Sequence, residues 1–279
     1  MTHTSTPPII RRLAVPGATL HYEVRGRGPV LAVIGSPMTA SEFAPVADAL
    51  AADYTVVTYD PRGLGASPID DPAQDSTPEL RADDVVAILD DLGAGPADVF
   101  GSSGGAVTGL ALAAKYPDRL RTLVAHEPPV LELLPAPEVE RQRAASRDIV
   151  ATFHRDGPGA AMAKFMANAG FTQADGAVPT PPGPPPSPEE MARQLAGLTR
   201  FFQHELLCTT TYLPDIEALK TARVVVGIGA DSEHLITHGT SMALCRQLGV
   251  EPVIFPGDHG GFIGAPEEFA AALRAALQH

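Results

Sequence analysis

The sequence predicts an α/β fold with a mostly parallel central sheet flanked by helices. Short runs rich in β-branched residues alternate with longer Ala- and Leu-rich segments at helical spacing, which is typical of parallel strands joined by crossover helices. The runs are apolar nearly throughout, as strands buried on both faces should be. The chain has 279 residues, enough for one large domain that carries an insertion.

The first predicted element is a hairpin. Residues 10–15 and 19–24 alternate in polarity around Pro16-Gly17, which indicates two antiparallel strands at a sheet edge. The other expected strands are 30–34, 54–59, 99–101, 120–125, 223–228 and 250–255. The expected helices between them are 41–52, 78–92, 104–116, 238–248 and 266–278.

The alternation of strands and helices stops after Glu127. From Pro128 to about Leu213 the pattern is helical without clear strands, and the proline-rich run 178–186 interrupts it. We therefore expect a core domain of residues 1–127 and 214–279, with 128–213 inserted as a helical cap. Such an insertion would lie over the carboxyl ends of the strands, where open α/β sheets bind ligands.

Composition argues against several classes of protein. The formal net charge of -13, from 33 acidic and 20 basic side chains, would repel nucleic acid and an anionic membrane surface. The two cysteines, Cys208 and Cys245, do not indicate a disulfide scaffold and are expected to be reduced. No apolar segment has the length of a signal peptide or a spanning helix, so we expect a soluble, cytoplasmic protein.

A candidate nucleophile lies in the sequence Gly101-Ser102-Ser103-Gly104-Gly105, directly after an apolar strand. A sharp strand-to-helix turn needs small residues two positions before and after the serine, because the two backbones approach closely there. Gly101 and Gly105 satisfy this requirement around Ser103. Centring the turn on Ser102 would put Phe100 at a position that must be small, so Ser103 is the candidate.

The same glycines could simply form a loop, or a phosphate cradle. A P-loop needs a Gly-Lys-Ser/Thr ending, which is absent here. A dinucleotide site needs Gly-x-Gly-x-x-Gly, where this chain has Gly101-Ser102-Ser103. The nucleophile is therefore favoured.

A serine nucleophile needs a base and a group that orients the base. Asp231 follows the predicted strand 223–228, and His259 follows the strand that ends at Phe255. Because the carboxyl ends of parallel strands share one sheet edge, both side chains are expected at the same edge as Ser103. The chain order Ser, Asp, His is one of the known orders of a catalytic triad.

In this order the motifs resemble the α/β-hydrolase family over nearly the whole chain. The matching residues are Gly35-Ser36-Pro37, 60–67, the Ser103 turn, 229–232 and 257–260. The resemblance implies that Ser103 is the nucleophile, His259 the general base and acid, and Asp231 the residue that orients His259. It also implies an oxyanion hole formed by the backbone N–H groups of Ser36 and Gly104.

The chain departs from this pattern before Ser36, where Ile34-Gly35 replaces the His-Gly of many relatives. Glu127, at the end of the strand 120–125, is a rival for the acid because some members of this fold place it there. Met38 and His126 lie at predicted strand ends and could line a substrate pocket, although ordinary packing explains them as well. Phe165, Phe171, Phe201 and Phe202 are expected to pack the cap and the ceiling of an apolar pocket.

Two further histidines, His234 and His238, have a spacing that a metal site can use, but no third ligand is evident. We expect no metal and no cofactor. The expected partner is a small-molecule substrate, and the oligomeric state stays open, with a homo-oligomer allowed.

The predicted function is hydrolysis of a small or medium, fairly apolar carboxylic ester or lactone through an acyl-enzyme. The alternatives are carbon-carbon bond hydrolysis, acyl transfer, perhydrolysis or cofactor-free oxygenation by the same residues. A non-catalytic ligand-binding homologue is a further alternative.

Overall fold

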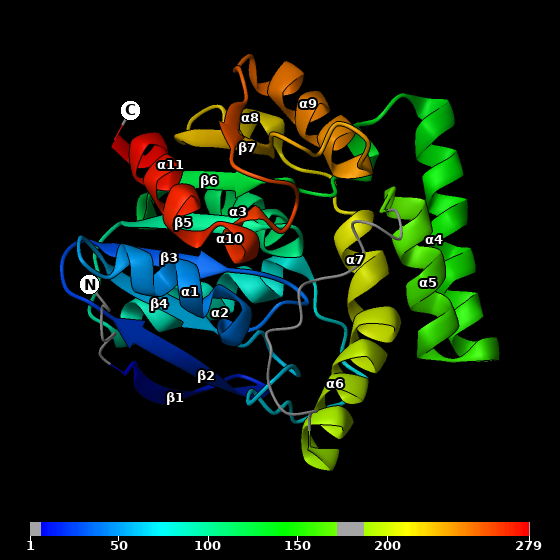
Figure 1. Cartoon of the computed structure of the whole chain (residues 1–279), viewed down its shortest axis with the longest axis horizontal. Coiled ribbons are helices and arrows are strands. Elements are labelled where there is room, and N and C mark those ends of the chain that lie inside the picture. Colours follow the sequence, from blue (N-terminus) through cyan, green and yellow to red (C-terminus); the bar gives the residue numbers. More distant parts are fainter. Residues whose placement is uncertain (1–6, 172–186, 279) are drawn as a thin grey trace.

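The computed structural model of the protein describes residues 7–171 and 187–278. Its core is an eight-stranded sheet with the strand order β1-β2-β4-β3-β5-β6-β7-β8 (Figure 1). The strands are β1 (Ile9–Val15), β2 (Ala18–Arg25), β3 (Val30–Ile34), β4 (Thr55–Tyr59), β5 (Ala97–Ser102), β6 (Leu120–His126), β7 (Val224–Gly229) and β8 (Val253–Phe255). The predicted fold class is confirmed.

The predicted antiparallel hairpin at the sheet edge is also confirmed. Strand β1 pairs antiparallel with β2, and β2 pairs antiparallel with β4. All pairings from β4 through β3 to β8 are parallel, so their carboxyl ends share one edge. Strand β8 begins at Val253 rather than at the expected residue 250, and it follows Pro252, which has no N–H to donate to a ladder.

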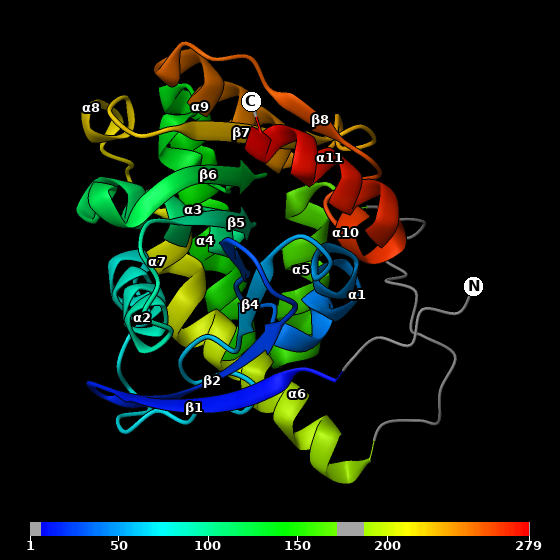
Figure 2. The same ribbon diagram turned by 90° about the vertical axis from the view of Figure 1, so that its left-hand side faces the viewer.

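Helices cover both faces of the sheet. They are α1 (Ala40–Leu50), α2 (Pro78–Asp91), α3 (Gly104–Lys115), α8 (Ile216–Leu219), α9 (Ile236–Leu248), α10 (Gly261–Gly264) and α11 (Pro266–Gln278), with a 3₁₀ turn at Pro117–Arg119. Figure 2 shows α1, α10 and α11 on one face and α2, α3 and α8 on the other. Each layer has its own apolar core, so the strands between the layers are buried on both sides.

The described residues between β6 and β7 are mainly helical. They contain a 3₁₀ turn (Leu131–Leu133), α4 (Ala136–Asp156), α5 (Pro158–Ala169), α6 (Pro188–Arg200), a π-helical turn (Phe201–Glu205) and α7 (Leu206–Thr210). Figure 1 shows this helical insertion beyond the carboxyl ends of the parallel strands. The predicted proline-rich interruption at 178–186 lies outside the described residues.

The helical insertion has a small aromatic core of its own and is tied to the rest of the chain. Phe165 contacts Phe201 edge to face at 5.3 Å, and Phe202 is buried beside them. Arg200 donates hydrogen bonds to the backbone of the loop before α2, to the carbonyl groups of Pro72 at 3.1 Å and Gln74 at 2.6 Å. These contacts fix the insertion against the loop that leads into α2.

Both cysteines are free thiols, as expected. Among the described residues, no helix combines the length and the apolar character needed to cross a membrane.

Candidate active site

Ser103 lies at the turn between β5 and α3 and has an unusual backbone conformation. Its φ of 57° and ψ of -125° place a non-glycine residue in a region that L-residues rarely adopt. A Cβ added at Gly105 would lie 2.3 Å from the carbonyl oxygen of Ile34, and one added at Gly101 would lie 2.5 Å from that of Gly105. The glycines therefore permit the close approach that the turn requires, as the sequence predicted.

The two predicted oxyanion residues lie side by side. A Cβ added at Gly104 would lie 2.7 Å from the carbonyl oxygen of Ser36 and 3.0 Å from its Cβ. Within the described residues, neither the Ser36 N–H nor the Gly104 N–H donates a hydrogen bond to another protein group. Gly104 is also the first residue of α3, so the dipole of this helix favours negative charge there.

His259, in the loop after β8, is held by Glu127 rather than by the expected Asp231. Nδ1 of His259 lies 2.6 Å from Oε2 of Glu127, whose side chain is fully buried. The prediction that Asp231 orients His259 is therefore corrected to Glu127, the rival from the end of β6. The longer side chain of Glu127 starts at the strand next to β5, and its φ of 50° turns the chain at this point.

Two further hydrogen bonds fix the Glu127 carboxylate. Oε1 accepts from the backbone N–H of Gly229 at 2.8 Å, and Oε2 accepts from the Thr237 hydroxyl at 2.8 Å. Burial by itself raises the pKa of Glu127, but the hydrogen bond and charge of His259 outweigh it and lower this pKa to about 2. Glu127 is therefore ionised at neutral pH and accepts a hydrogen bond from Nδ1–H of His259, which leaves Nε2 without a proton and able to act as a base.

Asp231 lies two residues beyond β7 and is exposed to solvent. Its backbone N–H donates to the carbonyl of Gly257 at 3.0 Å, so the turn supports the loop that carries His259. With Glu233 and His234, Asp231 lines a shallow surface pocket. The contribution of Asp231 to the loop is therefore made through its backbone.

His126 does not line an open pocket, because it is fully buried. Its ring packs against Phe255 and Phe269 and lies almost parallel to the ring of His259, with 6.2 Å between centroids. Nδ1 of His126 is 3.2 Å from the Ser102 hydroxyl. Burial lowers the pKa of His126 to about 4, so it is neutral at pH 7.

Met38 is half-buried and packs beside the aromatic core around α1 and α10. Phe171, at the edge of the helical insertion, contacts the His259 ring edge to face at 6.0 Å. An aromatic side chain at the edge of the insertion thus reaches the candidate base.

The pairing of β5 with β6 brings the nucleophile and the acid to one place. Ser102 is opposite His126 in the parallel ladder, so Ser103 and Glu127 follow at the same sheet edge. The backbone N–H of Ser103 donates to the carbonyl of His126 at 3.0 Å. Ser103 and Glu127, which holds His259, therefore lie at the carboxyl ends of neighbouring strands, and within the described residues no hydrogen bond joins the Ser103 hydroxyl to His259.

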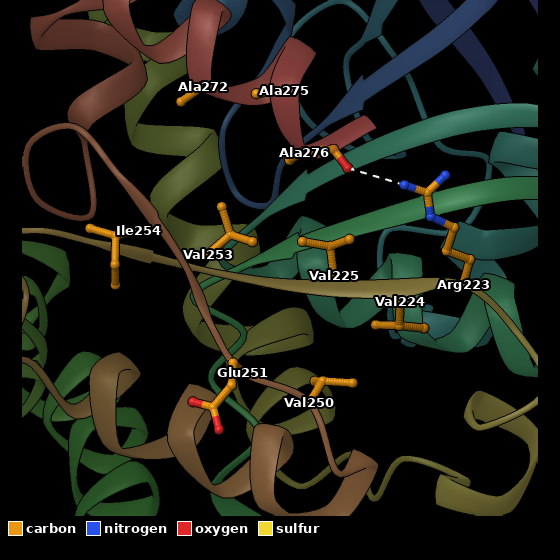
Figure 3. Close-up of a pocket in the computed structure, with 10 residues that line it drawn as sticks. All are labelled: Arg223, Val224, Val225, Val250, Glu251, Val253, Ile254, Ala272, Ala275 and Ala276. Carbon is orange, nitrogen blue, oxygen red and sulfur yellow. Dashed lines mark hydrogen bonds between the residues drawn. The ribbon is translucent and has the colours of Figure 1, made fainter. Parts of the chain in front are cut away.

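A separate, largely apolar pocket lies between β7, β8 and α11 (Figure 3). Its lining includes Val224, Val225 and Val253, which lie away from the carboxyl ends of the strands, and none of the candidate catalytic residues. Across residues 7–171 and 187–278, no group of three His, Cys, Asp or Glu side chains could hold a metal ion.

Comparison with known proteins identifies the family. The model of the alpha/beta hydrolase fold family matches residues 28–170, about half of the chain. The uncharacterized hydrolase YraK of Bacillus subtilis (strain 168) is 34% identical over 273 residues, which cover 95% of this chain and 95% of that protein.

Solved structures agree over nearly the whole chain. A hydrolase from Pseudomonas aeruginosa PA01 has a TM-score of 0.74 and 22% identity, and the match covers 97% of this chain and 98% of the other. A thermophilic esterase from Thermogutta terrifontis has a TM-score of 0.70 and 25% identity, with 98% of each chain covered. The chain is therefore a hydrolase that belongs to the α/β-hydrolase family.

Proposed function

We propose that the protein is a serine hydrolase that cleaves a small or medium, fairly apolar carboxylic ester or lactone through an acyl-enzyme. The observation that carries this proposal is the backbone of Ser103, a non-glycine residue held at a φ of 57° at the start of α3. Such a conformation costs free energy and persists where the surrounding structure enforces it, which is common at active sites. Ser103 directly precedes Gly104, which packs against Ser36, and the N–H groups of these two residues are the proposed oxyanion donors.

In the proposed reaction, the Ser103 oxygen attacks the carbonyl carbon and its proton passes to Nε2 of His259. Glu127 holds Nδ1 of His259 and stabilises the imidazolium that forms. The negative charge on the former carbonyl oxygen is stabilised by the N–H groups of Ser36 and Gly104. Collapse of this intermediate expels the alcohol, which takes the proton from His259.

Water completes the cycle. His259 removes a proton from the water as it attacks the acyl-enzyme, and then returns a proton to the Ser103 oxygen as the carboxylic acid leaves. A lactone would follow the same steps, with its alcohol and acid leaving as one molecule. No cofactor is needed for either half of the reaction.

The apolar character of the substrate is supported by the surroundings of His259. The rings of Phe171 and His259 meet edge to face with 6.0 Å between their centroids, and the insertion has an aromatic core. The similarity to the thermophilic esterase, at 25% identity, supports an ester as the substrate class.

The test is turnover of a simple activated ester by Ser103→Ala. We expect at least about a 10³-fold loss of kcat/KM. The matched control is Ser102→Ala, which removes the neighbouring buried hydroxyl and should retain most of the activity. Wild-type turnover by Ser103→Ala would refute the proposal, and so would hydrolysis that is lost only in Ser102→Ala.

A further inference from the structure

A buried charged cluster lies directly behind the candidate oxyanion hole. It consists of Arg81 from α2, Glu205 from the π-helical turn of the insertion, and the side chain of Ser36. Their exposed fractions are 0%, 1% and 3%. Because ionised groups are rarely buried so completely, this cluster needs a physical explanation.

The Ser36 hydroxyl joins the two charges. It donates a hydrogen bond to Oε2 of Glu205 at 2.8 Å and accepts one from Nη1 of Arg81 at 2.9 Å. Nη1 of Arg81 also lies 3.5 Å from the same Glu205 oxygen. The residue whose backbone N–H forms one side of the oxyanion hole is therefore fixed by its own side chain.

Arg81 also reaches the other side of the hole. Its Nε donates to the Thr108 hydroxyl at 3.1 Å, and that hydroxyl donates to the carbonyl of Gly104 at 3.1 Å. Its Nη2 donates to the Thr209 hydroxyl, in α7 of the insertion, at 2.8 Å. One guanidinium is thus connected to both oxyanion residues and to the helical insertion.

Fold stability alone is a poor explanation for this cluster. Well-packed apolar residues of similar volume are often as stabilising as a buried ion pair, because they avoid the cost of removing charges from water. Within the described residues, Oε1 of Glu205 has no hydrogen-bond partner, which adds to that cost. The charged groups instead fix the positions of their neighbours, because the planar guanidinium of Arg81 holds several hydrogen-bond acceptors in defined directions.

We propose that Arg81 and Glu205 act through the Ser36 hydroxyl as positioning residues for the oxyanion hole and make its geometry depend on the docked helical insertion. The proposal rests on the proposed serine hydrolase function. Glu205 ends the π-helical turn, a local distortion that often occurs at functional sites. Movement of the insertion would displace Glu205 and with it the Ser36 N–H.

The first experiment compares Ser36→Ala with Ser241→Ala for an activated ester. Ser241 is a matched control because it is equally buried, in α9, and its hydroxyl has no partner among the described residues. Ser36→Ala keeps the backbone N–H but should lower kcat by about 10- to 100-fold, since small displacements of catalytic donors have large effects. KM should stay within about threefold, because the hole acts mainly on the transition state.

Inhibition by phenylboronic acid gives a readout that a purely structural role would not move. Its adduct with Ser103 places an oxygen in the oxyanion hole, so the inhibition constant should rise in Ser36→Ala by a factor similar to the loss in kcat. Ser36→Ala should unfold at a lower temperature than Ser241→Ala, because it removes hydrogen bonds to two buried charges, but loss of stability alone would not raise the inhibition constant of the folded enzyme. Equal kcat and equal inhibition constants in Ser36→Ala and Ser241→Ala would overturn the proposal.

A double-mutant cycle tests the link to the insertion. Glu205→Gln should lower kcat in the wild-type background and have little further effect in Ser36→Ala, because Glu205 acts through the Ser36 hydroxyl. Additive losses would overturn the link. Ser103→Ala separates the two proposals. If it is inactive while Ser36→Ala matches Ser241→Ala, only the positioning proposal fails, and if it retains wild-type turnover, both fail.

Discussion

The carboxylate of Glu127 accepts a hydrogen bond from the backbone N–H of Gly229 at 2.8 Å. The acid that follows β6 is therefore anchored to the end of β7, just before the turn that carries Asp231. Two acidic residues leave neighbouring strands at one sheet edge, but only Glu127 is directed inward to His259. The roles of the two residues can be separated by substitution.

Replacing Glu127 with Gln should lower kcat by about 10²- to 10⁴-fold. The amide would offer an N–H group to Nδ1 of His259, which favours the tautomer with the proton on Nε2 and removes the base. Asp231→Asn should stay within about threefold of wild type, because the Asp231 contact that holds the loop is made by its backbone. Steady-state ester hydrolysis by both variants checks this, and the reverse pattern would return the role to Asp231.

The backbone conformation of Ser103 predicts that a glycine variant is more stable than an alanine variant at this position. A φ of 57° strains a residue with a Cβ but not glycine, so Ser103→Gly should be more stable than Ser103→Ala by about 1 kcal/mol. Both variants lack the nucleophile and should be inactive. Denaturant unfolding measures the difference, and an alanine variant as stable as the glycine variant would argue against strain at this turn.

Close backbone approach at the turn predicts a large cost for Gly105→Ala. The added methyl group would lie 2.3 Å from the carbonyl oxygen of Ile34 and 2.6 Å from the Cα of Gly35, so the backbone must shift. We expect a loss of about 3 kcal/mol in the free energy of unfolding. Gly159→Ala is the control in α5, where no atom lies within 4 Å, and it should be neutral or slightly stabilising.

Burial of His126 predicts a pH dependence of stability. Its pKa is lowered from 6.5 to about 4 in the folded protein, so the unfolded chain binds more protons between these values. The free energy of unfolding therefore carries no penalty from His126 above about pH 6.5. It falls as the pH drops from 6.5 toward 4, because the unfolded chain then binds the proton that the buried ring does not. The sign follows from burial, which disfavours the charged ring in the folded state.

Wild-type protein should consequently lose about 2 kcal/mol of unfolding free energy from this group between about pH 7 and pH 5. His126→Gln should show a shallower slope across the same window, whatever its absolute stability. Glu127 does not contribute to the change in stability between pH 7 and pH 5. Its pKa is lowered from 4.5 to about 2, so its stabilising effect is lost only below about pH 4.5. Equal slopes in the two proteins would contradict the prediction.

Much of the fold and part of the site could be predicted from the sequence. The strands are buried on both faces, so their apolar runs predicted the sheet well. The glycines around Ser103 predicted the turn because only small residues fit there. Both features depend on residues that are close together in the sequence, so the sequence alone can predict them.

The acid could not be decided in this way. Glu127 and Asp231 both follow apolar strands, and the difference between them comes from distant groups, the N–H of Gly229 and the hydroxyl of Thr237. The cluster of Arg81, Ser36 and Glu205 was also missed, because its members come from three separate elements. No local pattern in the sequence marks this cluster, because its contacts are set by tertiary packing alone.

Mass spectrometry after brief exposure to a panel of activated esters is the most direct measurement of the central claim. The protein is quenched within one turnover, digested, and searched for an acyl group. We predict an adduct on Ser103 in wild-type protein, with more adduct accumulating where deacylation is slow, and none in Ser103→Ala. Ester hydrolysis with the acyl group on another residue, or undiminished hydrolysis by Ser103→Ala, would contradict the account.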